Sequence, residues 1–392
     1  MRPLKNQFFL SFAVVGSLVP LMSVFLSEAK GLQKSDIGTA MSLSAAASVF
    51  SALMALLADT RGDARRILAL CFDHQRRRAG AAFPAAGPLL HRPALGHPRS
   101  HPWSRCSLQD ATLFFSAARA AAAGGEPAPA YPAIRVWGTI GYIVPSIALF
   151  IALRVCDFQV EAILYAGIAF ALLSVANTFF LPGVRAARAG QRLGWGPTKT
   201  AFRTLLGPRA RPLILAIAIA AIASTIYHSF FGLYVREEVG LPPEWVGVLM
   251  NIGVFIEIFF TLLLPWLLRR LGMKYLIAIG FAAMATRLFL LAAFPGVAMT
   301  AATQIGHGIE IMAMFVVPVM FLDRLAGDEF RNSIQGCFAM FIGVFRVGGS
   351  IGGGHLAEHF GLRPTFALAG ALAVVAILAI LIFFRPLAED EG

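Results

Sequence analysis

The chain has 392 residues, of which 58% are hydrophobic and 14% charged, and its mean hydropathy is +0.72. In soluble proteins roughly a quarter of all residues are charged. The composition therefore excludes an ordinary soluble protein and indicates a polytopic helical membrane protein. The net charge of +12 does not indicate a nucleic-acid partner, because the basic residues lie in short loops between apolar runs.

The cysteines predict neither disulfides nor a metal centre. Cys71, Cys106, Cys156 and Cys337 are scattered, without a Cys-x-x-Cys pair or a His/Cys cluster at metal-ligand spacing. The sequence also shows no nucleophile–base constellation. We therefore expect no metal, no cofactor and no enzymatic activity.

Apolar runs of about 20 residues, long enough to cross a bilayer, recur along the chain. The first run, 7–26, contains Pro20, where we expect a kink. It lacks a small-residue cleavage site, which favours a first span over a signal peptide. Asp36 is a candidate N-cap for the second span. Further spans are expected at 36–58, 108–123, 136–153, 161–181, 213–235, 245–268, 275–294, 299–322, 333–354 and 364–384.

The segment 72–107 interrupts this pattern where a third span is expected. It is rich in arginine, histidine and proline, and its longest apolar stretch, 79–90, contains two prolines. That stretch is too short and too broken to cross a bilayer. One interpretation is a reading-frame slip in a GC-rich gene, and the alternative is a real, divergent extramembrane loop.

A basic segment without acidic residues, 182–212, divides the chain. We expect an N-terminal transmembrane half at 1–181, a central cytoplasmic loop at 182–212, a C-terminal half at 213–384 and a tail at 385–392. With 72–107 set aside, the termini and alternate loops carry 19 Lys and Arg residues, against five in the opposite loops. The positive-inside rule then predicts that both termini are cytoplasmic.

Two turns resemble the loop motif of the major facilitator superfamily. The turn after the second span is a degenerate form, with Ala55 in place of the leading glycine, and the turn 269–274 resembles its repeat. The resemblance implies tight glycine turns whose charges cap helix ends and latch neighbouring helices between states. The candidate gate residues are Asp59, Gly62, Arg65, Arg269, Gly272 and Lys274.

The chain more closely resembles the nucleoside:proton symporter family, in the runs 132–142, 265–274 and 331–336. The resemblance implies an all-α membrane protein with the major facilitator fold, nominally twelve helices in two six-helix halves, with a mid-bilayer substrate site. It further implies a monomeric inner-membrane carrier that takes up a nucleoside together with protons. There are two alternatives. The chain could be a permease for a sugar or aromatic acid, or a non-transporting remnant damaged in the third span.

The same resemblance places Arg135 and Thr139 at the substrate cavity. An arginine can donate hydrogen bonds to a nucleoside carbonyl or hydroxyl, and Thr139 lies one turn later on the same helix face. Alternatively, Arg135 anchors its helix end at the lipid headgroups.

Glu257 is the leading candidate for proton coupling, because it lies in the middle of the span 245–268. A carboxylate at this depth must be protonated, paired or exposed to water. The family carries an acid at this position. A static carboxylate bonded to a neighbouring helix is the alternative.

His307 and Glu310 lie three residues apart on one helix face. They could relay a proton or hold ribose hydroxyls, or they could pair with each other as a structural unit. Here the chain departs from the family, whose nucleoside symporters place an aspartate where Met312 aligns. Glu310 could replace that aspartate.

Other polar residues within the spans are candidates for binding a nucleoside. Tyr227 and Tyr142 could stack on a base or simply pack, His228 interrupts an apolar run, and Asn251 could form hydrogen bonds or be wetted near a helix end. Arg287 and Arg346 also lie within spans and need acidic or carbonyl partners, for which Glu257 or Glu310 would serve. The candidate substrate-binding residues are Arg135, Thr139, Tyr142, Tyr227, His228, Asn251 and Met312.

Overall fold

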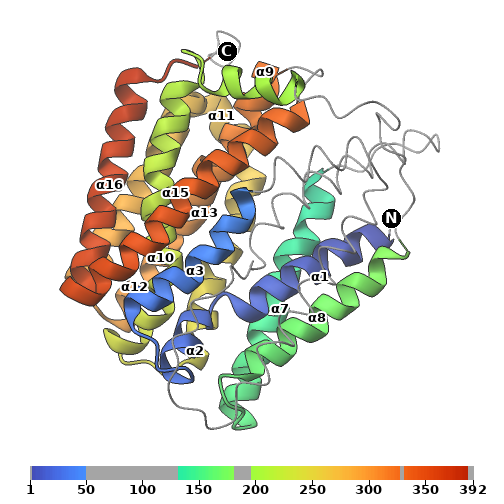
Figure 1. Ribbon diagram of the computed structural model, residues 1–392, viewed down its shortest axis with the longest axis vertical. Helices are drawn as coiled ribbons and strands as arrows, with labels where there is room; N and C mark the ends of the chain where they lie inside the picture. Colours follow the sequence, from blue (N-terminus) through green and yellow to red (C-terminus); the bar gives the residue numbers. More distant parts are fainter. Residues whose placement is uncertain (1, 50–130, 181–195, 327–330, 387–392) are drawn as a thin grey trace.

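The computed structural model describes residues 2–49, 131–180, 196–326 and 331–386, and these fold into helices (Figure 1). The first of them group around α1, which packs against α7 and α8. These N-terminal helices are α1 (Arg2–Leu18), α2 (Met22–Glu28), α3 (Lys34–Val49), α7 (Tyr131–Val155) and α8 (Ala162–Thr178). The break between α1 and α2 confirms the kink expected at Pro20, whose ring removes a backbone donor.

Glycine explains why α1 and α7 approach so closely. A Cβ atom on Gly141 of α7 would overlap the carbonyl oxygen of Phe9, and one on Gly16 of α1 would overlap that of Tyr142. The two backbones are therefore in direct contact, as small residues permit in membrane helices. The run 132–142 thus has a structural role in joining these two helices.

The C-terminal helices form a second group, in which α10 packs against α15 and α16, and α11 against α16 and α13. Its elements are α9 (Gly196–Leu205), α10 (Arg211–Glu237), α11 (Glu244–Ala293), α12 (Val297–Thr303), the 3-10 turn η2 (Gln304–Gly306), α13 (His307–Ile311), the π-helical turn η3 (Met312–Val316), α14 (Val317–Ala326), α15 (Arg331–Phe360) and α16 (Leu362–Phe383). The two groups meet where α3 packs on α15 and α7 on α11 (Figure 1).

The 50-residue element α11 comprises two spans. Gly272 has φ 68° and ψ 166°, a conformation essentially restricted to glycine, so the chain reverses there. This confirms the separate spans expected at 245–268 and 275–294. The tight glycine turn expected between them is also present.

The span expected at 299–322 is present as a series of short helical pieces from Val297 to Ala326. Pro318 lies just after the π-helical turn Met312–Val316. Because proline lacks the backbone N–H and crowds the carbonyl four residues earlier, the helix widens over the preceding turn. The π-helical turn begins two residues after Glu310.

The central segment 182–212 was expected to be a loop, and that expectation is wrong for its second part. Helix α9 occupies Gly196–Leu205 and packs on α15 and α14. Ala201 and Leu205, one turn apart, are completely buried, while Lys199 and Arg203 are exposed. The polar composition hid an amphipathic helix with a narrow apolar stripe.

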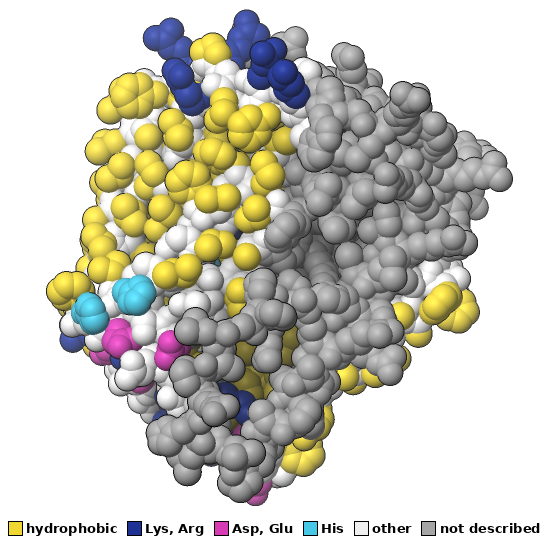
Figure 2. All heavy atoms as spheres, in the orientation of Figure 1, with side chains coloured by type: hydrophobic (Ala, Val, Ile, Leu, Met, Phe, Trp, Pro, Cys, Tyr) yellow, Lys and Arg dark blue, Asp and Glu magenta, His cyan; other side chains and the backbone are white. Residues whose placement is uncertain are grey.

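Seven described helical stretches are long and apolar enough to cross a membrane, and one of them is α11 with its two spans. Large hydrophobic side chains cover their outer faces; on α16, Leu368, Val375, Leu378 and Ile382 are all exposed. Figure 2 shows this apolar surface, with basic side chains gathered at the end near α9 and acidic and histidine side chains towards the other end. An outer surface of this kind is suited to lipid.

Several predictions lie partly or wholly outside the described residues. The second span, expected at 36–58, is present as α3 up to Val49, and residues 50–58 lie outside the described part. The expected span 108–123, the segment 72–107 and the gate residues Asp59, Gly62 and Arg65 all lie outside it. The remaining expected spans are present, most of them extended by a few residues at one or both ends.

Candidate substrate and proton-coupling site

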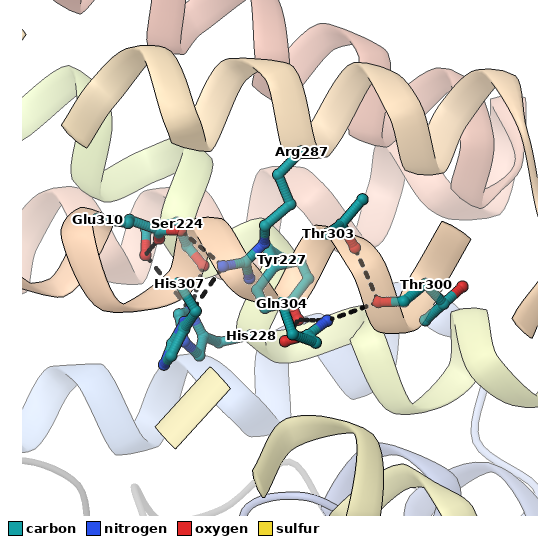
Figure 3. A network of polar contacts seen from close by, with 9 residues as sticks. All are labelled: Ser224, Tyr227, His228, Arg287, Thr300, Thr303, Gln304, His307 and Glu310. Atoms are coloured by element: carbon teal, nitrogen blue, oxygen red, sulfur yellow. Dashed lines mark hydrogen bonds and ion pairs between the residues drawn. The ribbon is translucent and has the colours of Figure 1, made fainter. Parts of the chain in front are cut away.

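A network of buried polar side chains lies among the C-terminal helices (Figure 3). Its members come from three stretches, and in two of them the polar residues recur at helical spacing and so share a face. They are Ser224, Tyr227 and His228 of α10, Arg287 of α11, and Gln304, His307 and Glu310 from η2 and α13. All of them lie within candidate membrane spans.

The centre of the network is an ion pair between Arg287 and Glu310. Arg287 Nη1 lies 2.9 Å from Glu310 Oε2, and the two side chains are 2% and 1% exposed. Ser224 donates to the other carboxylate oxygen, Oε1, at 3.0 Å. Both oxygens of Glu310 therefore accept a hydrogen bond from the protein.

Arg287 is held on one side by an aromatic ring. Its guanidinium carbon lies 3.8 Å from the ring centroid of Tyr227, a close cation–π contact. The Tyr227 hydroxyl is in turn bonded to the amide of Gln304 at 3.2–3.3 Å. Nε and Nη2 of Arg287 are buried without a hydrogen-bond partner among the described residues, so the cation retains unused donors.

Two histidines adjoin the pair, with ring centroids 5.8 Å apart. His307 Nδ1 lies 3.2 Å from Arg287 Nη1; because a guanidinium only donates, this nitrogen accepts and the proton of the neutral ring is on Nε2. His228 Nδ1 lies 2.7 Å from the Ser224 carbonyl oxygen and donates to it. The two rings therefore carry opposite tautomers.

This arrangement excludes one of the alternatives left open by the sequence and decides another. His307 and Glu310 do not pair with each other: Arg287 contacts both and lies between them. Of the two acids considered as partners of Arg287, the structure selects Glu310. Arg346 donates to the hydroxyl of Thr225 at 3.2 Å.

Glu257 lies beside the network, in the first span of α11. A Cβ atom on Gly308 would come within 2.9 Å of the Cα and N atoms of Glu257, so this part of α11 is in backbone contact with α13 next to His307. One turn earlier, Gly253 packs against the His307 ring. Glu257 itself is half-buried, and its carbonyl oxygen accepts from Thr261.

Helix α7, which carries three of the predicted ligands, packs on α11. Tyr142 is buried and its hydroxyl lies 3.9 Å from the sulfur of Met250, while Thr139, one turn earlier, is also buried. Arg135 is in the first turns of α7. Asn251 of α11 is buried, at 4% exposure.

The remaining predicted residues lie elsewhere. Met312 is packed in the apolar core at 1% exposure, just after Glu310, so in this conformation it does not offer a surface to a substrate. Arg269 is exposed, and Lys274 is half-buried, on either side of the Gly272 turn. These three residues form the described part of the predicted gate.

Sequence reasoning did not name Ser224 and Gln304. The sequence does contain a pattern that identifies both residues: Ser224 precedes His228 by four residues, and Gln304 precedes His307 by three. Such spacing places them on the same faces as the named histidines.

The family follows from comparison with known proteins. The family model described as the MFS_1 like family matches residues 1–73 and 108–368. This chain belongs to that family. The match leaves out 74–107, which lie within the segment that the sequence marks as anomalous.

Individual relatives are transporters of small molecules. The chain is 23% identical to the xanthosine permease of Escherichia coli, over 97% of this chain and 94% of that protein, and 24% identical to the maltose permease of Geobacillus stearothermophilus, over 96% and 93%. A crystal structure of the nucleoside transporter NupG, a D323A mutant, superposes with a TM-score of 0.81 at 20% identity, covering 98% of this chain and 99% of that one. The chain is therefore a multi-pass membrane transporter with the major facilitator fold, not an enzyme.

Proposed function

We propose that this transporter takes up a nucleoside together with a proton by alternating access. The observation that carries the proposal is the buried pair Arg287–Glu310, with His307 against it and Glu257 on the adjoining helix. Removing two charges from water costs free energy that their attraction often does not recover. A buried ion pair is therefore weak evidence for a purely stabilising role. Ionisable groups inside a membrane protein are by default candidates for an ion pathway.

The proton is carried by Glu257, the half-buried carboxyl beside the network. Glu310 and His307 are the supporting groups. Protonation of Glu257 removes a charge from the middle of the membrane span, which favours a conformation in which that position is dry. Glu310 is already paired with Arg287 and bonded to Ser224.

The nucleoside is held by Arg135, Thr139 and Tyr142 of α7 together with Tyr227 and His228 of α10. Arginine, threonine and histidine supply hydrogen bonds to ribose hydroxyls and base carbonyls, and the aromatic rings suit a base. The similarity to a xanthosine permease and to the nucleoside transporter NupG supports this substrate class. The maltose permease supports a sugar as the second candidate.

Topology supports uptake into the cell. The exposed basic side chains at the end where α9 lies, among them Lys199, Arg203, Arg209 and Arg211, favour placing that end in the cytoplasm (Figure 2). The two termini would then be cytoplasmic, the segment 182–212 would join the halves 1–181 and 213–384 on that side, and the membrane would be the inner membrane. We take the unit of transport to be a monomer.

Substrate identity is tested by counterflow in proteoliposomes. Vesicles loaded with unlabelled uridine are expected to accumulate labelled uridine, and competition by xanthosine but not by maltose or an aromatic acid is expected. If maltose alone competes, the proposed substrate is wrong and a sugar takes its place. The assignment of fold and family would not change.

The coupling is tested by Glu257→Gln. The variant should lose uphill uptake driven by a pH gradient and retain exchange, because the neutral side chain mimics the protonated state. Glu161→Gln is a matched control near the start of α8, outside the network. Accumulation by Glu257→Gln at the parent level would exclude Glu257 as the proton carrier.

A non-transporting remnant is the remaining alternative, and 72–107 is the reason for it. The family match also lacks 74–107. If this stretch is a reading-frame slip, the gene in a shifted frame encodes an apolar third span. Restoring that frame should then increase membrane insertion and uptake. An unchanged level of insertion, or the same residues recurring in close relatives, would make it a real loop.

A further inference from the structure

Helix α9 presents to the outside an apolar stripe that the packing of the helices does not use. On its inner side Ala201 and Leu205 are completely buried, and α9 packs on α15 and α14. Phe202 is 37% exposed; Leu206, whose backbone N–H donates to the Phe202 carbonyl, is 40% exposed. Residues four apart share a helix face, so an outward apolar stripe lies beside the buried one.

Basic side chains flank the outward stripe. Lys199 and Arg203 of α9 are exposed and four residues apart, and exposed Arg209 and Arg211 follow at the start of α10. The sequence from 196 to 236 contains no Asp or Glu, and none of the four basic residues forms an ion pair with another described residue. The described part of the protein therefore leaves this charge unneutralised. The α9 surface consists of Lys199, Phe202, Arg203, Leu206, Arg209 and Arg211.

The α9 surface lies where the surface of a bilayer meets the protein. Figure 1 shows α9 crossing one end of the molecule, whereas α16 runs along its length. Helix α10, which begins at Arg211 shortly after α9, is a candidate membrane span, so α9 stands just outside the hydrocarbon. Figure 2 shows basic side chains gathered at this end. A short helix that carries basic residues beside exposed Phe and Leu has the pattern of an interfacial helix.

We propose that the α9 surface binds the headgroups of anionic phospholipids. Clusters of four or more Lys and Arg next to a membrane span attract such headgroups. A free phosphate would use the charges alone, whereas an interfacial lipid also buries Phe202 and Leu206 among its headgroups and upper acyl chains. The inner side of α9 stays on α15 and α14, so this helix links the C-terminal group of helices to the lipid surface. The inference goes beyond the proposed function, because it needs neither a nucleoside nor a proton.

Lipid retention by the full chain tests the proposal. The protein is purified in a nonionic detergent, mixed with equal amounts of phosphatidylglycerol and phosphatidylcholine at low salt, and separated from free lipid by gel filtration. The phospholipid that stays with the protein is then extracted and measured. The parent should retain at least about fivefold more phosphatidylglycerol than phosphatidylcholine, since four cations act together. This ratio should approach one at about 0.5 M salt, because salt screens exposed charges.

Removal of two charges from α9 tests the electrostatic part. Lys199→Gln combined with Arg203→Gln should lower the retention ratio to below about twofold, whereas Lys199→Arg combined with Arg203→Lys should keep the parent's ratio. Lys30→Gln combined with Arg363→Gln removes the same charge from exposed positions at the opposite end of the molecule and is the matched control. A neutralised α9 that retains phosphatidylglycerol at the parent's ratio would overturn the proposal.

Removal of the outward apolar stripe tests the insertion of α9 into the lipid surface. Phe202→Ser combined with Leu206→Ser leaves the charge unchanged and should still lower the retention ratio to below about twofold. Inorganic phosphate at the concentration of the phosphatidylglycerol should not displace the lipid. A ratio that the apolar substitutions leave at the parent's level, or full displacement by inorganic phosphate, would make the surface a site for a free anion and contradict the proposal.

Cys337 reports whether the lipid acts at α9. Its buried sulfur lies 3.8 Å from the carbonyl oxygen of Thr198 in the first turn of α9. With Cys71, Cys106 and Cys156 replaced by serine, phosphatidylglycerol should slow maleimide labelling of Cys337 about threefold, because bound lipid stabilises the docked helix. Phosphatidylcholine should leave the rate unchanged. If phosphatidylglycerol also leaves it unchanged, the retained lipid lies elsewhere and the proposal is wrong.

The acidic end of the sequence is the competing occupant of the α9 surface. Glu389, Asp390 and Glu391 lie outside the described residues. A parent that shows no lipid preference, and that acquires one only after all three are changed to glutamine, would assign the surface to this acidic segment and overturn the proposal. Gel filtration of every variant distinguishes the loss of a lipid site from unfolding.

Discussion

The ion pair Arg287–Glu310 gives the sharpest prediction on stability. Glu310→Gln leaves Arg287 as a buried cation at 2% exposure without its counter-ion. Removing one member of a buried pair typically costs about 3–5 kcal/mol, because the remaining charge is desolvated and unpaired. We expect the lower end, about 3 kcal/mol, since the glutamine carbonyl can still accept from Arg287 while its amide donates to the Ser224 hydroxyl. In a chain of this size the midpoint of thermal unfolding should fall by on the order of 5 °C.

The assay is thermal unfolding of the purified protein in detergent, followed by intrinsic fluorescence. Glu28→Gln is the matched control, because it breaks the pair with Arg236 that is 37–45% exposed and should cost less than about 1 kcal/mol. The double variant Arg287→Met with Glu310→Gln should recover most of the loss, since no buried charge remains. A single Glu310→Gln variant as stable as the parent, or a double variant no more stable than the single one, would refute the reasoning.

Three further predictions concern the helices that support the site. Gly272→Ala should lower the midpoint of thermal unfolding, because a side chain at φ 68° and ψ 166° is strained by about 1–3 kcal/mol. Gly141→Leu should abolish recovery of folded protein, whereas Gly352→Leu, at a position where an added Cβ atom would meet nothing within 4 Å, should be tolerated; equal yields would show that α1 and α7 need no close approach. Ala201→Asp should detach α9, so that buried Cys337, whose sulfur lies 3.8 Å from the Thr198 carbonyl, reacts faster with a maleimide; unchanged reactivity would contradict the packing of α9 on α15.

Much of the helical architecture could be predicted, because the length of the apolar runs and a few helix-breaking residues determine it. The spans from 213 onwards follow from runs of about 20 apolar residues, and Pro20 and Gly272 mark breaks that depend on local backbone chemistry. Helix α9 was missed because only two of its apolar residues, Ala201 and Leu205, are fully buried, within a segment whose basic composition is typical of loops.

The site was harder to predict than the spans. The sequence showed that Arg287 needed an acid, but it could not distinguish Glu257 from Glu310, because that choice depends on how two helices are rotated relative to each other. The unknown rotation of the helices also explains why the burial of Met312 and Asn251 was not predicted. Helical spacing identifies neighbours within one helix and does not show which face meets another helix, so the burial of these two side chains was not predictable.

The central claim is that movement of a nucleoside and movement of a proton are one event. Proteoliposomes with a pH-sensitive dye inside test it directly at zero membrane potential. Adding uridine outside should acidify the interior of vesicles that contain the parent protein, and Glu257→Gln should show no acidification. With one proton per nucleoside, an inward gradient of about one pH unit should support about tenfold accumulation. Uridine entry without any proton movement would contradict the account.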